Sequence, residues 1–135
     1  MQRILGIDYG EKRVGLALSD PLQMFASPYK TIPNNPGLIT AIQTIMNEND
    51  VACVAVGLPK GMKGQETAQT QNVYRFVECL NDQDITVNLI DERLTSVSAK
   101  KALVEQGIKT GHNKGLIDQT AAAIILQQIL DSQKG

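Results

Sequence analysis

Three carboxylates, Asp8, Glu92 and Asp118, stand where the folded chain could bring them together. Asp8 ends a short apolar run, Glu92 follows another, and Asp118 comes just before three consecutive alanines. An ionised carboxylate at the edge of a core is costly unless a partner offsets its charge, and a divalent cation is an effective partner. Because all the candidate ligands are oxygens, the residues predict a site for Mg²⁺ or Mn²⁺ rather than zinc.

The chemistry that such a site supports is metal-assisted hydrolysis of a phosphodiester bond. One ion generates hydroxide from water, and a second stabilises the leaving oxygen. The chain has one histidine, His112, in a stretch rich in glycine and lysine, and no motif that pairs a Ser or Cys nucleophile with a histidine base. The sequence therefore favours hydrolysis by acids and metal ions over nucleophilic catalysis.

Each acid also has a purely structural interpretation. Asp8 could accept hydrogen bonds from the amides of the turn that follows it. Asp118 could complement the positive end of a helix dipole, and Glu92 could pair with Arg93 or lie in a solvated turn. Either Asp91 or Glu92 could be the acid that faces the site, because one residue of register reverses the direction of a strand side chain.

Apolar periodicity predicts the elements that must position these acids. Short apolar runs indicate strands, and apolar residues at helical spacing indicate helices. The predicted strands are 4–7, 14–18, 25–32 (an edge strand), 51–56 and 85–90, and the predicted helices are 38–49, 66–80, 95–106 and 116–132, with a mobile loop at 108–115. Because helices connect the later strands, these strands should run parallel to the first one. Asp8 and Glu92 should then meet at one edge of the sheet.

The bulk properties predict a reduced, cytoplasmic protein made of a single domain, 1–135. A chain of 135 residues can bury a core without disulfides or a structural metal. Cys53 and Cys79 lack the spacing of metal ligands, and no apolar run approaches the length of a membrane span. We expect no membrane association.

The charge of the chain is unevenly distributed. The net charge is −1, but the segment 93–114 carries five basic residues against one acidic residue, which leaves it at +4. The rest of the chain, with eight basic and thirteen acidic residues, stands at −5. This balance argues against indiscriminate binding of polyanions and allows a directed contact through the basic segment.

Four sequence blocks resemble the YqgF/RuvX family of bacterial RNase H-like proteins. They are GIDYGEKRVGLALSD (6–20), VGLPKGMKG (56–64), DERLTS (91–96) and KGLIDQTAAAIILQ (114–127), and they follow one another in order over almost the whole chain. The resemblance implies an α/β, RNase H-like fold with a five-stranded mixed sheet of order 3-2-1-4-5, in which strand 2 is antiparallel. It also implies a metal-dependent nuclease site on Asp8, Glu92 and Asp118.

Basic residues in and around these blocks are candidate phosphate contacts. Arg93 could bind a phosphate with two hydrogen bonds, although a structural salt bridge would explain it equally well. Glycines at 10 and 15 would permit a tight turn and a close approach of backbone to phosphate, and those at 57, 61 and 64 would make the adjoining loop flexible. The full set of candidate nucleic-acid contacts is Lys12, Arg13, Lys60, Arg93, Lys109 and Lys114.

The resemblance implies a Mg²⁺-dependent nuclease that processes the 5′ end of pre-16S rRNA during ribosome biogenesis. Cleavage of branched DNA is the second activity that the family suggests, and it would require a dimer that presents two sites to a symmetric junction. Two function classes without nuclease chemistry also fit parts of the sequence, namely a non-catalytic nucleic-acid-binding assembly factor and an ATP-binding module of the actin type. We expect a monomer or a weak homodimer.

Overall fold

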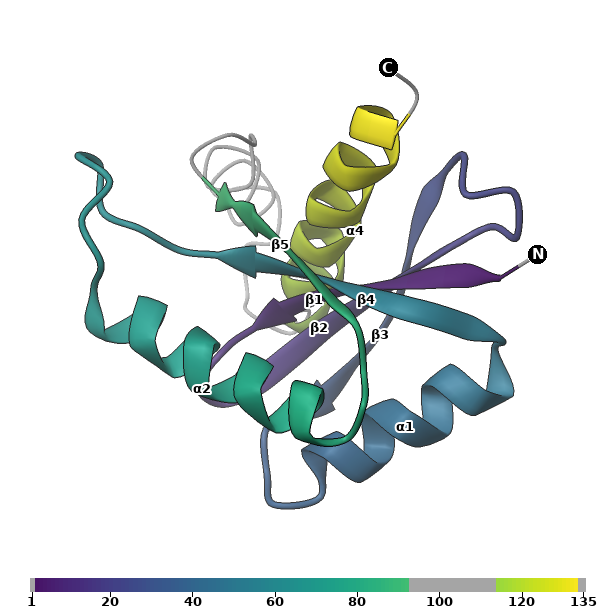
Figure 1. Cartoon of the computed structure of the whole chain (residues 1–135), viewed down its shortest axis with the longest axis horizontal. Coiled ribbons are helices and arrows are strands. Elements are labelled where there is room, and N and C mark those ends of the chain that lie inside the picture. Colours follow the sequence, from purple (N-terminus) through teal and green to yellow (C-terminus); the bar gives the residue numbers. More distant parts are fainter. Residues whose placement is uncertain (1, 93–113, 134–135) are drawn as a thin grey trace.

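The structure is a computed structural model that describes residues 2–92 and 114–133, apart from the side chain of Lys114. Five strands and three helices make up the described part (Figure 1). In chain order they are β1 (Arg3–Tyr9), β2 (Arg13–Ser19), β3 (Ala26–Pro33), α1 (Leu38–Glu48), β4 (Val51–Leu58), α2 (Ala68–Asp82), β5 (Val87–Asp91) and α4 (Lys114–Gln133).

The five strands form one mixed sheet of order β3-β2-β1-β4-β5. Strand β2 is antiparallel to both β1 and β3, whereas β4 is parallel to β1 and β5. The predicted α/β class, strand order and antiparallel second strand are confirmed. Strand β3 lies at an edge, as its proline indicated.

The two faces of the sheet are covered by different helices, as Figure 1 shows. Leu5 and Ile7 of β1 pack in the larger core cluster, which contains Ile42 of α1 and Phe76 of α2. Ile4, on the opposite face of the same strand, packs with residues of α4. Because side chains alternate along a strand, every position of β1 is assigned to one of two layers, and Asp8 falls on the α4 side.

Small residues let α4 lie close to its face of the sheet. A Cβ atom at Gly6 would lie 2.7 Å from Cβ of Leu126, and Ala17 and Ala55 of the neighbouring strands pack against Ala122 in the same cluster. The alanine-rich helix therefore lies close to the sheet, which holds Asp118 near the strand ends.

The helix boundaries differ by a few residues from the predicted ones. Helix α2 begins at Ala68 because Thr67 caps it through a reciprocal capping box with Thr70. Helix α4 already includes Lys114 and Gly115, so the predicted loop at 108–115 is wrong at its last two residues. The predicted helix 95–106 and the rest of that loop lie outside the described residues. Within those residues, no helix combines the length and apolar character needed to cross a bilayer.

Candidate acidic active site

Asp8 lies near the carboxyl end of β1 and is buried, with 7% of its surface exposed. It is one of three buried polar side chains in the described part of the chain, together with Ser19 and Thr70. Its position two residues after Gly6 directs it to the α4 face of the sheet. A rigid central strand therefore presents this carboxylate at the edge of the core, as the sequence predicted.

Gly15 makes room for Asp118 beside Asp8. In the pairing of β1 with β2, Gly15 is the direct partner of Asp8. A Cβ atom at Gly15 would lie 2.8 Å from Cβ of Asp118 and closer still to its backbone carbonyl group. Only a residue without a side chain fits there, so the first described turns of α4 rest on β2 next to Asp8.

Gly57 makes room for Glu92 on the other side of Asp8. Gly57 follows Val56, the partner of Ile7 in the parallel pairing of β1 with β4, and so continues the register to a position beside Asp8. A Cβ atom at Gly57 would lie 2.7 Å from Oε1 of Glu92. The side chain of Glu92 therefore crosses the end of β4 on the face that carries Asp8.

The direction of β5 distinguishes Glu92 from its neighbour Asp91. Ile90 packs against the cluster that contains α4, so the alternation along the strand turns Asp91 toward the opposite face. The partner of Asp91 in β4 is Leu58, which belongs to the core cluster beneath α1 and α2. Glu92, rather than Asp91, lies on the same side of the sheet as Asp8.

Asp118 is held by Arg13. The Nε of Arg13 donates a hydrogen bond of 2.8 Å to Oδ2 of Asp118, and the two side chains are 43% and 15% exposed. Asp118 is the fifth residue of the described α4, and no acidic residue occupies the first turn, so the interpretation of Asp118 as a partner of the helix dipole is wrong. A partly exposed ion pair is worth about 0.2–1 kcal/mol, which lets the carboxylate exchange partners.

The donor set fits a hard divalent cation in its chemistry, since all three side chains are carboxylates on one face and one edge of the sheet. Within residues 2–92 and 114–133, no three Asp, Glu, His or Cys side chains lie close enough together to ligate one ion. The ligation of a shared ion by Asp8, Glu92 and Asp118 therefore stays a prediction.

Only some of the residues predicted to contact phosphates lie in the described part of the chain. Lys12 is exposed at the β1–β2 turn, and Lys60 is half-buried in the segment after β4. Arg13 has a carboxylate partner that the sequence pattern did not indicate. Arg93 and Lys109 lie outside the described residues, as does the side chain of Lys114.

Gly10 lies in the turn after β1, as predicted, with its amide donating to the carbonyl of Arg13 at 3.0 Å, but other glycines act differently from the sequence-based prediction. Gly15 and Gly57 lie inside strands and admit the two acids, rather than forming a turn or a flexible loop. The loop after β4 is a hydrogen-bonded turn, in which the amide of Gly61 donates to the carbonyl of Gln65 and Gly64 adopts φ 84°. The sequence does contain two glycines within apolar strands, which could have indicated close contacts at these positions. Only the strand register shows for which acid each glycine leaves room.

Comparison with known proteins finds a family match over almost the whole chain. The family model RuvX, described as a Holliday junction resolvase, matches residues 2–132. A curated relative from Endomicrobium trichonymphae is 41% identical over 137 residues, which is 98% of both chains, and one from Chloroflexus aggregans is 43% identical over 136 residues, or 98% of this chain and 96% of the relative. Both carry the name "Putative pre-16S rRNA nuclease".

Solved structures share the fold at low sequence identity. RuvC of T. thermophilus in complex with a Holliday junction substrate superposes with a TM-score of 0.62 and 19% identity, over 100% of this chain and 97% of that one. The Fowlpox virus resolvase in complex with Holliday junction DNA gives a TM-score of 0.57 and 11% identity, over 99% and 100% of the two chains. The sheet and helices described above are thus those of RuvC-like, RNase H-fold proteins.

Proposed function

The chain belongs to the RuvX family, and we propose that it is a metal-dependent nuclease that hydrolyses phosphodiester bonds in structured nucleic acid. The observation that carries this proposal is the placement of Asp8, Glu92 and Asp118 on one face of the sheet. Gly15 leaves room for Asp118, and Gly57 leaves room for Glu92. A protein that only binds nucleic acid gains nothing from carboxylates that face phosphates. The acidic site therefore argues for catalysis over a purely structural assembly role.

Asp8, Glu92 and Asp118 are the residues that would hold Mg²⁺ or Mn²⁺, because the set offers only carboxylate oxygens. Such ions, when bound, activate a water molecule and stabilise the leaving oxygen. The chain itself supplies rigidity and charge. Asp8 is buried on the central strand, and Arg13 orients Asp118 through its 2.8 Å hydrogen bond.

Cationic side chains around the acids would bind the phosphates that flank the cleaved bond. Lys12 is exposed at the turn after β1, and Arg13 presents a guanidinium group that is 43% exposed beside the acids. Such contacts position a strand without reading its sequence. The proposed set is Lys12, Arg13, Lys60, Arg93, Lys109 and Lys114.

We infer that the substrate is the 5′ end of pre-16S rRNA, in line with the name of the curated relatives. The chain would act in the cytoplasm during ribosome biogenesis, as one nuclease domain spanning 1–135 and as a monomer or weak homodimer. The description of the family model favours a second candidate, cleavage of four-way DNA junctions. That activity would need two copies of the chain, since a symmetric junction is cut at two sites.

Cleavage assays on two substrates test the proposal. The purified full chain is incubated with Mg²⁺ and either a precursor rRNA segment or a four-way DNA junction, with Asp8→Asn as the inactive reference. We expect cleavage of the precursor RNA that depends on Mg²⁺ and on Asp8. Cleavage of the junction alone would replace the first candidate by the second. Failure to cut either substrate under conditions in which both bind would reject the nuclease assignment.

A further inference from the structure

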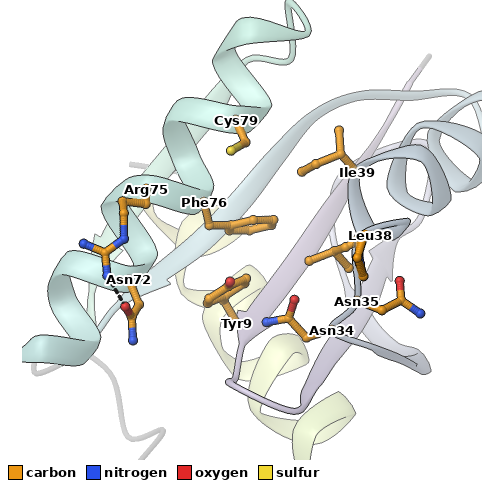
Figure 2. Close-up of a pocket in the computed structure, with 10 residues that line it drawn as sticks. Tyr9, Asn34, Asn35, Leu38, Ile39, Asn72, Arg75, Phe76 and Cys79 are labelled. Carbon is orange, nitrogen blue, oxygen red and sulfur yellow. Dashed lines mark hydrogen bonds between the residues drawn. The ribbon is translucent and has the colours of Figure 1, made fainter.

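A cavity of about 230 Å³ opens at the end of β1 on the face opposite the acids (Figure 2). Tyr9 and Phe76 line it with stacked rings, whose centroids are 4.3 Å apart at an interplanar angle of 21°. The start of α1 and the exposed side of α2 form its walls, and the turn between β3 and α1 forms its rim. The cavity is smaller than the 300–1,000 Å³ or so of sites for drug-sized ligands, so it suits a single small ring system.

A chain of hydrogen bonds positions the guanidinium group of Arg75 at this cavity. The amide of Gln69 donates to the carbonyl of Tyr9 at 3.1 Å, and the amide of Asn72 donates to Oε1 of Gln69 at 3.1 Å. Arg75 in turn donates to Oδ1 of Asn72. Arg75 has no carboxylate at salt-bridge distance in the described part of the chain. Its positive charge is thus positioned from the end of β1 and remains available to an anion.

Polar groups with unused hydrogen-bonding capacity also line the cavity. The side-chain amide of Asn34 donates to the carbonyl of Gly10 at 2.8 Å, and this bond ties the rim to the β1–β2 turn. Among residues 2–92 and 114–133, no donor reaches Oδ1 of Asn34 and no partner reaches the hydroxyl of Tyr9. An apolar ring surface, an acceptor, a hydroxyl and a cation therefore surround one small space.

We propose that this cavity binds one unpaired nucleotide of the substrate strand, with its base against Tyr9 and its phosphate at Arg75. Phe76 covers one face of the Tyr9 ring, so the base would stack on the other face. Amide and hydroxyl groups suit the edges of an unpaired base. Asp8 and Tyr9 are consecutive residues that point to opposite faces of the sheet, so a strand that bends around the end of β1 contacts both. This inference rests on the proposed function, which brings a nucleic-acid strand to Asp8.

The two cysteines allow the cavity to be tested without any catalysis. Cys79 lines the cavity and is exposed, whereas Cys53 is half-buried and burial raises the pKa of its thiol. In the full chain carrying Cys53→Ala, with no divalent cation present, the rate of alkylation of Cys79 is measured with and without single-stranded RNA. At an RNA concentration about ten times Kd, we expect the rate to fall about tenfold. The same RNA as a blunt duplex, at equal occupancy by fluorescence anisotropy, should leave the rate unchanged.

Charge-matched variants separate the cavity from general attraction to RNA. Arg75→Gln should abolish most of the protection of Cys79, whereas Lys30→Gln, which also removes one positive charge from an exposed site outside the cavity, should retain it. Cys79→Phe adds bulk at an exposed helix position and should weaken the binding of single-stranded RNA relative to duplex. Equal protection in the Arg75 and Lys30 variants would contradict the role of Arg75.

Three outcomes would overturn the proposal. They are an unchanged alkylation rate when single-stranded RNA is fully bound, equal protection by duplex RNA, and equal protection by a nucleoside monophosphate at the same concentration as the RNA strand. The last result would identify a site for free nucleotides instead of a strand. The proposed nuclease function is tested separately. A chain whose Cys79 is protected by single-stranded RNA but which cuts no substrate would contradict the nuclease function and leave the proposal for the cavity intact.

Discussion

Replacing Gly15 with alanine should move α4 away from the sheet. The added methyl group would lie 2.8 Å from Cβ of Asp118 and closer still to the backbone carbonyl of that residue, which cannot rotate aside. Overpacking costs about 1–3 kcal/mol, and a contact with backbone belongs at the upper end of that range. Relief of the entropic cost of glycine in a strand returns about 0.5–1 kcal/mol. We therefore expect Gly15→Ala to lower the free energy of unfolding by about 2 kcal/mol.

Gly15→Ala should reduce the cleavage rate by a larger factor than its loss of folding stability alone would suggest. The methyl group can be accommodated only if α4 shifts, and Asp118 shifts with it. A misplacement of about 1 Å in a catalytic group costs roughly a hundredfold in rate. We expect the cleavage rate of Gly15→Ala with Mg²⁺ to fall by about that factor at a temperature where the variant is fully folded.

Urea denaturation and initial cleavage rates measure the two effects. Gly37→Ala is a matched control, because its Cβ would meet only Oδ1 of Asn35 at 3.4 Å, an ordinary contact, at the N-cap of α1. Its stability should change by less than about 1 kcal/mol, with an unaltered cleavage rate. If Gly15→Ala proves as stable and as active as Gly37→Ala, then Gly15 does not set the distance between α4 and the sheet, and the reasoning is wrong.

Four further predictions concern other residues. Gly57→Ala should cost only about 1 kcal/mol in urea denaturation, because the atoms that it meets belong to the side chains of Ile125 and Glu92 and not to the backbone, yet it should slow cleavage since one of them is Oε1 of Glu92. Asp8→Asn should abolish cleavage while leaving the melting temperature without metal equal or higher, because it removes one of three like charges on the same face of the sheet; a lower melting temperature with wild-type cleavage would contradict this. Lys12→Gln should reduce the log–log salt slope of binding by about 0.7 on single strands, and an unchanged slope would exclude a phosphate contact. Hydrogen bonds from backbone amides, that of Phe25 first, lower the pKa of Asp20. Because the folded state therefore favours the carboxylate, the Met24 and Phe25 amides should be fully protected from hydrogen exchange above the usual aspartate pKa, and this protection should be lost as pH falls through the lowered pKa. Protection that persists at lower pH would refute the link.

The elements of this fold could be predicted from the sequence because their signals are local. The apolar run that ends at Asp8 and the helical spacing of Leu38, Ile42 and Ile45 identify a strand and a helix from neighbouring residues alone. The observed start of a helix differs from the predicted one where a capping side chain sets it. Thr67, through its capping box with Thr70, moved the start of α2 to Ala68.

The set of candidate acids could also be proposed from the sequence, because parallel strands must end at one edge of a sheet. Their arrangement could not, since it depends on contacts between residues far apart in the chain. The register of β1 against β2 makes Gly15 the partner of Asp8, and that register is set by packing of both sheet faces. The pairing of Arg13 with Asp118, 105 residues away, follows only once α4 rests on β2.

The cavity beneath Tyr9 belongs wholly to the tertiary structure. In the sequence, Tyr9 is one aromatic residue beside an acid, and Arg75 is one cation on a helix. Alternation along β1 turns Tyr9 away from Asp8, and the docking of α2 on that face stacks Phe76 on its ring and directs Arg75 through Asn72. Local pattern thus determined which side chains are available for chemistry. Packing across the sheet decided which of them share a site, because only the folded chain brings distant residues within contact distance.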